Sequence, residues 1–233
     1  MFKIIKISVY LLIIVFLYGL VPKAQAKNDS LFIFVEYAAK TGKCTQSSND
    51  QVNIYTIGKW KLKSGMTDYK ITYSSKPKNL SGENIRIAVE KSFQTIQGAN
   101  NGELFRYAGE SKELKPTKDG QNSIFWLPLR GGVVATTYIW TENSRVVDAD
   151  IIFNRRYVWS NTEYNGSNDC GGSAKTYDIR NIATHEIGHW IGLVDNYNSQ
   201  AKDQTMYGFA SLSELKKVTL GVGDINGIKS NWP

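Results

Sequence analysis

The residues best suited to chemistry form the run HEIGH at positions 185–189. On a helix, residues i and i+4 lie on one face about 6 Å apart, so His185 and His189 can direct a ring nitrogen at the same metal ion. Glu186 lies next to the first histidine, close enough to reach a metal-bound water without displacing it. The chain has only these two histidines, so its whole histidine content lies at ligand spacing. The run therefore predicts a metal site with Glu186 as the general base.

The residues after this run supply a turn and a third ligand. Gly192 can adopt the positive φ that ends a helix, and that turn would bring Asp195 back toward the histidines. Asp203 is a second candidate, but it lies outside this spacing. Three protein ligands leave one coordination position open for water, which distinguishes a catalytic zinc from a structural one. We therefore predict a Zn2+ site formed by His185, His189 and Asp195.

The elements that would position these side chains follow from the hydrophobic pattern. Apolar residues around the run predict a buried helix that starts near residues 176–178. A longer helix is predicted from an N-cap at Ser81 to about Gly98, and a short C-terminal helix over 224–230. Strands are predicted at 31–37, 69–73, 104–107, 123–127, 133–141 and 146–153. Strands and helices that do not strictly alternate indicate an α+β fold with one mixed sheet.

The first 26 residues have the pattern of a cleaved signal peptide. Two lysines precede an uncharged apolar run over residues 9–20, and Ala24-Gln25-Ala26 supplies the small-x-small site that signal peptidase recognises. The run is shorter than the ~20 residues that a bilayer span requires, which favours cleavage over a permanent anchor. We expect cleavage after Ala26, secretion, and no stable membrane anchor afterwards.

The exported part carries only a mild positive charge. The formal net charge of the chain is +7, and it falls to +4 without the first 26 residues, which contain three lysines and no acid. The remaining lysines are scattered and interrupted by acids, so they cannot follow a phosphate backbone. Nucleic acid is therefore excluded as a partner. The length of 233 residues suits one packed domain, and we expect a monomer.

Residues 177–189 resemble the active-site helix of bacterial matrixin-like metallopeptidases, which are metzincins. The resemblance extends upstream to 148–154 and downstream to Thr205-Met206-Tyr207, which looks like the Met-turn that places a methionine beneath the metal. It covers roughly residues 68–230 in order. The resemblance implies a metzincin-type catalytic domain with a mixed, mostly parallel twisted sheet, an active-site helix, a Met-turn and a C-terminal helix. In this division, 1–26 is the signal peptide, 27–65 an N-terminal extension or short pro-segment, and 66–233 the catalytic domain.

The third ligand departs from the usual matrixin pattern, which has histidine where this chain has Asp195. In this respect the chain resembles the snapalysin-like metzincins, which are known for aspartate there. An anionic ligand lowers the net charge of the site and should slightly weaken zinc as a Lewis acid. Tyr197 and Tyr207 could both approach the cleft. Tyr207 follows the methionine directly, unlike the zinc-binding tyrosine of astacins, so we interpret it as structural.

The resemblance implies a secreted zinc endopeptidase that hydrolyses peptide bonds in proteins through a zinc-activated water, with Glu186 as the general base. The protein or peptide substrate would extend antiparallel to an exposed edge strand at 132–141. Residues 209–211 would form the wall of the pocket for the side chain after the cut. The alternative is a catalytically silent zinc-binding module that acts through partner binding. The intact Glu186 favours the enzyme.

Two further features leave alternatives open. Cys44 and Cys170 most simply form a disulfide in an oxidising compartment, although Cys44 could instead bind the zinc as a thiolate and keep a precursor silent. The sequence around Cys44 lacks the arginine and proline of the matrixin latency switch, which favours the disulfide. Asp148 and Asp150 could bind a structural Ca2+, as matrixins often do. Otherwise they are exposed strand residues or turn partners.

Overall fold

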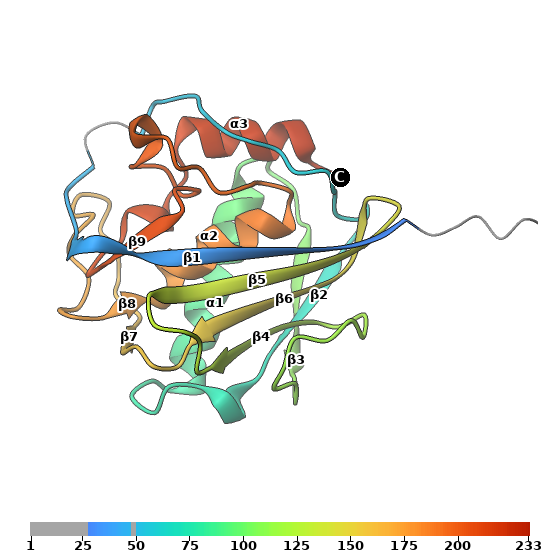
Figure 1. Cartoon of the computed structure of the whole chain (residues 1–233), viewed down its shortest axis with the longest axis horizontal. Helices are drawn as coiled ribbons and strands as arrows, with labels where there is room; N and C mark the ends of the chain where they lie inside the picture. The colour runs from blue at the N-terminus through green and yellow to red at the C-terminus, as the bar shows by residue number, and fades with distance from the viewer. Residues whose placement is uncertain (1–27, 48–49) are drawn as a thin grey trace, which may run out of the picture.

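The computed structural model describes residues 28–47 and 50–233 (Figure 1). The predicted signal peptide therefore lies outside the described residues. No helix in the described part of the chain is both long and apolar enough to cross a membrane. The α-helices are α1 (Gly82–Gly98), α2 (Ile179–Trp190) and α3 (Val222–Asn231), and three 3-10 turns occupy Tyr73–Ser75, Ser199–Ala201 and Lys216–Val218.

One seven-stranded sheet forms the centre of the molecule, in the order β3-β2-β4-β6-β5-β1-β9. Four of its ladders are parallel, and the two that join β5 to β6 and to β1 are antiparallel. The predicted α+β fold with a mixed, mostly parallel sheet is confirmed. The strands of this sheet are β1 (Asp29–Lys43), β2 (Thr67–Ile71), β3 (Phe105–Glu110), β4 (Asn122–Leu127), β5 (Val133–Glu142), β6 (Arg145–Asn154) and β9 (Phe209–Leu212), and a separate pair is formed by β7 (Trp159–Ser160) and β8 (Tyr177–Asp178).

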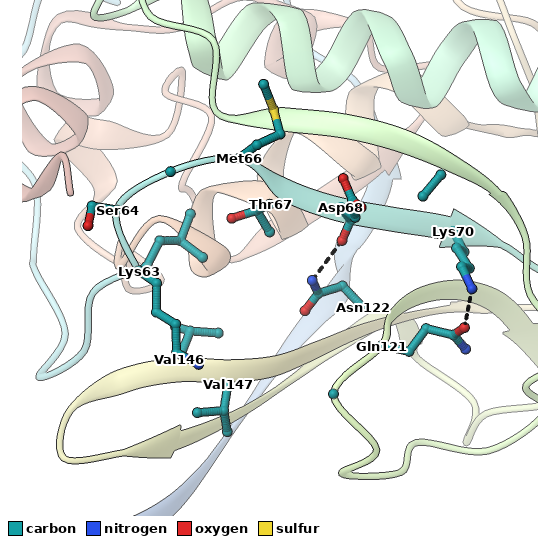
Figure 2. Close-up of a pocket in the computed structure, with 14 residues that line it drawn as sticks. Lys63, Ser64, Met66, Thr67, Asp68, Lys70, Gln121, Asn122, Val146 and Val147 are labelled. Atoms are coloured by element: carbon teal, nitrogen blue, oxygen red, sulfur yellow. Dashed lines mark hydrogen bonds between the residues drawn. The ribbon is translucent and has the colours of Figure 1, made fainter.

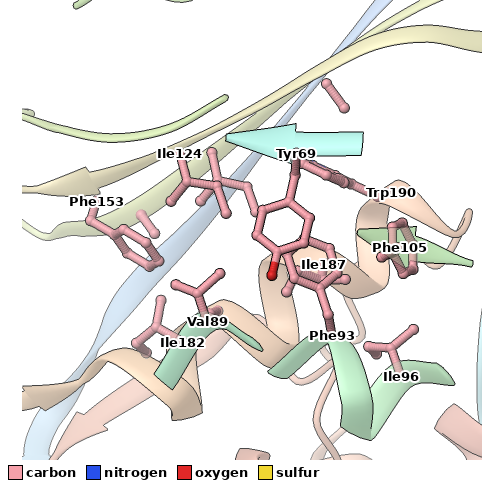
Figure 3. Close-up of a cluster of buried hydrophobic side chains, with 14 of the residues drawn as sticks. Tyr69, Val89, Phe93, Ile96, Phe105, Ile124, Phe153, Ile182, Ile187 and Trp190 are labelled. Carbon is pink, nitrogen blue, oxygen red and sulfur yellow. The ribbon is translucent and has the colours of Figure 1, made fainter. Parts of the chain in front are cut away.

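Helix α1 begins where its sequence predicts. The Ser81 hydroxyl accepts a hydrogen bond from the Asn84 amide at 3.0 Å, which satisfies one of the amides that a helix start leaves unpaired. Its apolar face lies against the sheet and α2, where Phe93 stacks on Tyr69 with ring centroids 3.9 Å apart (Figure 3). Trp190 from α2 belongs to the same cluster and packs against the Phe93 ring. Truncation of Phe93 to alanine would cost about 3–5 kcal/mol, so this cluster fixes α2 against the sheet.

The N-terminal strand differs most from expectation. The predicted strand at 31–37 belongs to the longer β1, which pairs antiparallel with β5 and parallel with β9. The expectation that residues 132–141 form an exposed edge strand is therefore wrong for the described chain, because β1 covers that edge (Figure 1). The register places Phe34 opposite Thr137 and Glu36 opposite Ala135.

The segment after β1 is tied to the body of the domain. Cys44 and Cys170 form a disulfide with their Cα atoms 5.6 Å apart, so the predicted bond is confirmed and the thiolate ligand is excluded. Farther along, Gly58 donates from its amide to the carbonyl of Gly192 at 2.8 Å. The indole of Trp60 donates to the His189 carbonyl at 2.9 Å. These contacts bring the N-terminal segment next to the end of α2.

Candidate metal centre

Helix α2 carries both predicted histidine ligands and Glu186 in a fully packed environment. Its N-cap is Asp178, whose carboxylate accepts from the Asn181 amide at 3.1 Å. The helix ends at Trp190, and Gly192 follows with φ of 101°, as its sequence predicts. A Cβ at this glycine would lie 1.9 Å from the Asn231 side chain, so both conformation and space require glycine. The turn reverses the chain toward the histidines.

The three predicted ligands lie together. The Nε2 atoms of His185 and His189 are 3.1 Å and 3.6 Å from Oδ1 of Asp195, and the three ligand atoms all lie within 4.8 Å of one another. Two ligands of a tetrahedral zinc are about 3.3 Å apart, so this spacing suits the ion. Asp203, the second candidate, instead lies 3.6 Å from Nζ of Lys216 and outside this group.

Hydrogen bonds fix which ring nitrogens are available. Nδ1 of His185 faces the Thr205 carbonyl and Nδ1 of His189 faces the Leu193 carbonyl, each at 2.8 Å. A carbonyl can only accept, so each Nδ1 carries a proton and each Nε2 is the atom that remains for a metal ion. In the described residues neither Nε2 atom nor Oδ1 of Asp195 has a hydrogen-bond partner. Three buried ligand atoms this close to one another require a proton or a metal ion between them, and this donor set fits zinc.

The pKa values of the metal-free site also indicate that the carboxylates around it stabilise a positive charge. Burial lowers the pKa of His189 to about 4. Burial and the Lys217 ammonium also act to lower the pKa of His185, but the carboxylates of Glu36 and Asp195 outweigh them and raise it to about 9. Burial opposes ionisation of Asp195, yet the two histidines hold its pKa below the usual range. A metal ion would therefore displace a proton from His185 on binding.

Glu186 is positioned to act as a base. Its side chain is fully buried, and Oε2 accepts a hydrogen bond from the Thr137 hydroxyl on β5. Its other oxygen, Oε1, has no hydrogen-bond partner among the described residues. Burial raises the pKa of Glu186 to about 8, against the lowering effect of His185. A carboxylate with one anchored oxygen, one free oxygen and a pKa near neutrality suits general-base chemistry.

The predicted Met-turn lies directly beneath α2. A Cβ at Gly188 would lie 2.4 Å from Sδ of Met206, so the glycine makes room for the methionine. The amides of Thr205 and Met206 donate to the Asp224 carboxylate at 2.8 Å and 3.2 Å. Because the Thr205 carbonyl accepts from His185, this aspartate indirectly fixes the orientation of that imidazole.

The two tyrosines near the site make different contacts. The Tyr197 hydroxyl donates to Oδ2 of Asp195 at 3.4 Å, and its side chain remains 53 % exposed. Tyr207 contributes its carbonyl, which accepts from the Lys217 ammonium. Its ring lies beside Phe209 on β9, consistent with a packing role for this residue.

Sequence reasoning missed two residues of the site. Lys217 is fully buried and donates to the carboxylate of Glu36, which lies on β1 and is also fully buried. Ligand atoms of Glu36, His185 and Glu186 all lie within 4.8 Å of one another. The only sequence signal was one acid inside an otherwise apolar strand pattern at 31–37, because no local motif reveals a partner 181 positions away.

The described hollows lie away from this centre. Figure 2 shows a pocket of about 410 Å³ between β2, β6 and the start of β4, where Asn122 donates to the Asp68 carbonyl and Lys70 to Gln121. None of the proposed metal ligands lines it. The histidines have no exposed surface. Two residues of β1 lie against this centre: the Phe34 ring stacks on the His189 imidazole, and the Glu36 carboxylate lies beside His185 and Glu186.

The expected calcium residues are held by the backbone. Asp148 accepts from the amides of Asp119 and Gly120, both at 2.6 Å, and Asp150 from those of Ser123 and Thr117. Both side chains are fully buried, so the expectation that they are exposed strand residues is wrong, and their role as turn partners fits these contacts. Calcium binding at this place stays a prediction.

Comparison with known proteins agrees with this geometry. No curated protein sequence matches the chain. The family model that describes matrixins matches residues 59–232, which include α2, the Met-turn, α3 and every strand of the large sheet except β1. This match covers well over half of the chain. The chain therefore belongs to the matrixin family, whose members are zinc metalloendopeptidases.

Proposed function

We propose that this protein is a secreted endopeptidase with a catalytic zinc held by His185, His189 and Asp195. The observation that carries the proposal is the group of three buried ligand atoms that lie close together and have no hydrogen-bond partner in the described chain. When bound there, zinc would act as a Lewis acid toward the peptide carbonyl and lower the pKa of a water molecule. The Asp195 carboxylate brings a negative charge to the ligand set, which favours a divalent cation.

Glu186 would carry out the proton transfers of the reaction. Its free Oε1 accepts the proton of the attacking water, while the Thr137 hydroxyl holds Oε2 and with it the orientation of the carboxylate. The same carboxyl then gives the proton to the leaving amine of the cut peptide. Because both histidines are fixed through Nδ1, the ligands need no rearrangement during these steps.

A substrate strand beside β5 would have to take the place that β1 holds in the described chain, with β9 on its other side. Residues 209–211 lie on β9 and support the expected pocket wall for the side chain after the cut. Export is supported by the signal-peptide pattern, and the disulfide between Cys44 and Cys170 is typical of an oxidising compartment.

Replacement of the base tests the proposal. Glu186→Ala, with the isosteric Glu186→Gln as its matched control, is expected to lower casein hydrolysis by at least ~10³-fold while one zinc ion stays bound. Hydrolysis is measured on the intact chain and after limited proteolysis, and zinc by mass spectrometry under non-denaturing conditions. If the wild-type chain binds zinc but cuts no peptide of a broad library in either form, the silent zinc-binding module is the better description.

A further inference from the structure

Lys217 is a buried cation beside the metal centre that the proposed chemistry does not use. Its side chain has no exposed surface, and its Nζ lies 3.5 Å from Nδ1 of His185. That nitrogen donates to the Thr205 carbonyl, so it cannot also accept from the ammonium. Lysine is almost never fully buried unless it is paired, so the acceptors around Lys217 indicate what it is placed to bind.

The fold holds Lys217 in one position. The residue lies in the 3-10 turn Lys216–Val218, which packs against α2. The side chain of Asn181 on α2 accepts from the Lys217 amide at 2.7 Å. The ammonium donates to the carbonyl of Tyr207, which directly follows the methionine of the Met-turn. The charge is therefore fixed between the active-site helix and the segment that leads into β9.

The Lys217 ammonium has one charged hydrogen-bond acceptor in the described chain, the carboxylate of Glu36. Glu214 is a second buried acid nearby, but its oxygens accept from the Asn181 side chain and the Ser211 amide, at 3.3 Å and 3.2 Å. Removal of one partner from a buried ion pair is strongly destabilising, because it leaves the other charge without compensation. A group that replaces the Glu36 side chain is therefore favoured if it is an anion.

Glu36 reaches Lys217 from the strand position that the proposed function gives to a substrate. It lies opposite Ala135 on β5, and the pairing with β9 begins at the next residue. A carboxylate oxygen of Glu36 lies within 4.8 Å of ligand atoms of His185 and Glu186. A substrate side chain at the same place would pass the catalytic base and end at the ammonium.

The side chain of Phe34 shows which peptide bond corresponds to the cut. Phe34 lies two residues before Glu36 and points to the same face, because side chains alternate along a strand. Its ring stacks on the His189 imidazole with centroids 4.1 Å apart, whereas Glu36 lies beside His185. The bond that joins positions 35 and 36 lies between these contacts. In a substrate, the side chain that replaces Glu36 would directly follow the cut, on the side of the expected pocket wall at 209–211.

We propose that Lys217 is a specificity-determining residue that selects substrates with glutamate directly after the bond that is cut. The inference rests on the proposed function and names the substrate class of the same site. The glutamate carboxylate would replace that of Glu36, while the Tyr207 carbonyl keeps its hydrogen bond to the ammonium. Glutamine would leave the lysine charge without a counter-charge, and leucine would also leave a donor unpaired. Aspartate is one methylene shorter and should reach the ammonium less well.

Peptides that differ only at this position test the selection. Hydrolysis by the zinc-loaded chain is measured as for Glu186→Ala, with glutamate, aspartate, glutamine or leucine after the cut. The kcat/KM for glutamate should exceed that for glutamine at least ~100-fold, because the site penalises a substrate that leaves its buried charge unpaired. Lys217→Met should lower this ratio below about threefold, whereas Lys217→Arg, which retains the charge, should keep it above about tenfold.

Two results of the peptide series would overturn the proposal. One is an equal kcat/KM for glutamate and glutamine in the wild type. The other is an unchanged ratio in Lys217→Met, because the preference would then come from another part of the site.

A second test needs neither zinc nor catalysis. Glu36→Ala removes the carboxylate from the full chain, and acetate matches the lost group in size and charge. At constant ionic strength, about 0.1 M acetate should raise the folding equilibrium constant of zinc-free Glu36→Ala about tenfold, as measured by urea unfolding. Neutral acetamide is the matched ligand control and should have no effect. The double variant Glu36→Ala/Lys217→Met is the matched protein control, and an equal effect of acetate on it would contradict the proposal.

The two proposals fail in different ways. If acetate stabilises Glu36→Ala through Lys217 but no peptide is cut, carboxylate recognition by Lys217 stands and the peptidase does not. If peptides are cut without a preference for glutamate, the peptidase stands and selection by Lys217 does not. If Glu36→Ala does not fold, the peptide series on the wild type and Lys217→Arg still decides the question.

Discussion

Two buried aspartates lie on either side of the segment that carries Met206, and they differ in what surrounds them. Asp224 accepts hydrogen bonds from the amides of Thr205, Met206 and Gly221. Asp195, whose side chain is 7 % exposed, faces the bare nitrogens of two histidines. The Asp224 carboxylate holds the backbone of the Met-turn through hydrogen bonds, and the Asp195 carboxylate is placed to bind a cation. Neighbouring donors, rather than residue type or burial, therefore decide what a buried aspartate does.

The acidic pair on β6 resembles Asp224 more than Asp195. Asp148 and Asp150 together accept four backbone amides, from Thr117, Asp119, Gly120 and Ser123. Oδ1 of Asp148 nevertheless lacks a partner among the described residues. In its hydrogen bonding, the pair of Asp148 and Asp150 is therefore intermediate between Asp224 and Asp195.

The largest effect is expected at Asp224. Asp224→Ala would leave three buried amides without an acceptor, and we expect a loss of about 4 kcal/mol in the free energy of unfolding. Urea unfolding of the zinc-free proteins measures it, with Asp224→Asn, which retains one acceptor oxygen, as the intermediate control. A loss below about 1 kcal/mol would show that these hydrogen bonds do not set the stability of the Met-turn.

At Asp195 we expect a large loss of zinc affinity rather than a large loss of stability. Asp195→Ala should raise the Kd for zinc at least ~100-fold, about 2.7 kcal/mol, because it removes one of three protein ligands. The stability of the zinc-free protein should change less than in Asp224→Ala, since the Tyr197 hydroxyl that loses its acceptor belongs to an exposed residue and can bind water instead. Competition with a chromophoric chelator measures the affinity. Asp203→Ala is the control and should bind zinc like the wild type; a weakened Asp203→Ala instead would identify that residue as the third ligand.

A pH effect is expected at Asp150. Burial, assisted by the charge of Glu113, raises its pKa to about 9 in the folded chain, against about 3.8 as its ordinary value. The folded state therefore binds the proton more tightly, so this group makes the free energy of unfolding fall as pH rises between about 4 and 9, by up to ~1.4 kcal/mol per pH unit.

Asp150→Asn should remove this slope. Urea unfolding at pH 5 to 8 without divalent cations compares the two proteins. The free energy of unfolding of the wild type could instead rise with pH, but only when millimolar calcium is added. In that case Asp148 and Asp150 would form a cation site, as Asp195 does, and would not resemble Asp224.

The smallest loss of stability is expected at Ser81, where water can replace the hydroxyl as hydrogen-bond acceptor. The Ser81 hydroxyl accepts from the Asn84 amide at an exposed helix start. Ser81→Ala should therefore cost only about 1 kcal/mol of unfolding free energy, measured in urea, with Ser81→Asp as a control that retains a capping oxygen. A loss as large as that at Asp224 would contradict the view that burial of the donors makes the difference.

Local patterns predicted what depends on neighbours in sequence. The N-cap at Ser81, the course of α1, the strands β5 and β6 and the turn at Gly192 all follow from spacing and residue type. The gathering of His185, His189 and Asp195 also follows, because one helical turn and one reversal bring them together.

What the sequence did not reveal depends on distant partners. Leu31 to Tyr37 indicated a strand, but pairing with β5 joins residues about one hundred positions apart, and no short pattern encodes that choice. The ion pair of Glu36 with Lys217 is hidden for the same reason. The short strand β9 was expected only as a pocket wall, since four residues give too little alternation to predict a strand.

The position of β1 also bears on how the protein behaves in solution. Departure of this strand exposes the backbone N–H and C=O groups of β5 over Val133–Glu142, and uncovers the ring of Trp60. A long bare strand edge next to apolar surface is a template for pairing with other chains. Unless a ligand takes up that edge, a chain that lacks β1 should self-associate as its concentration rises. Pairing with β1 thus protects the sheet from aggregation.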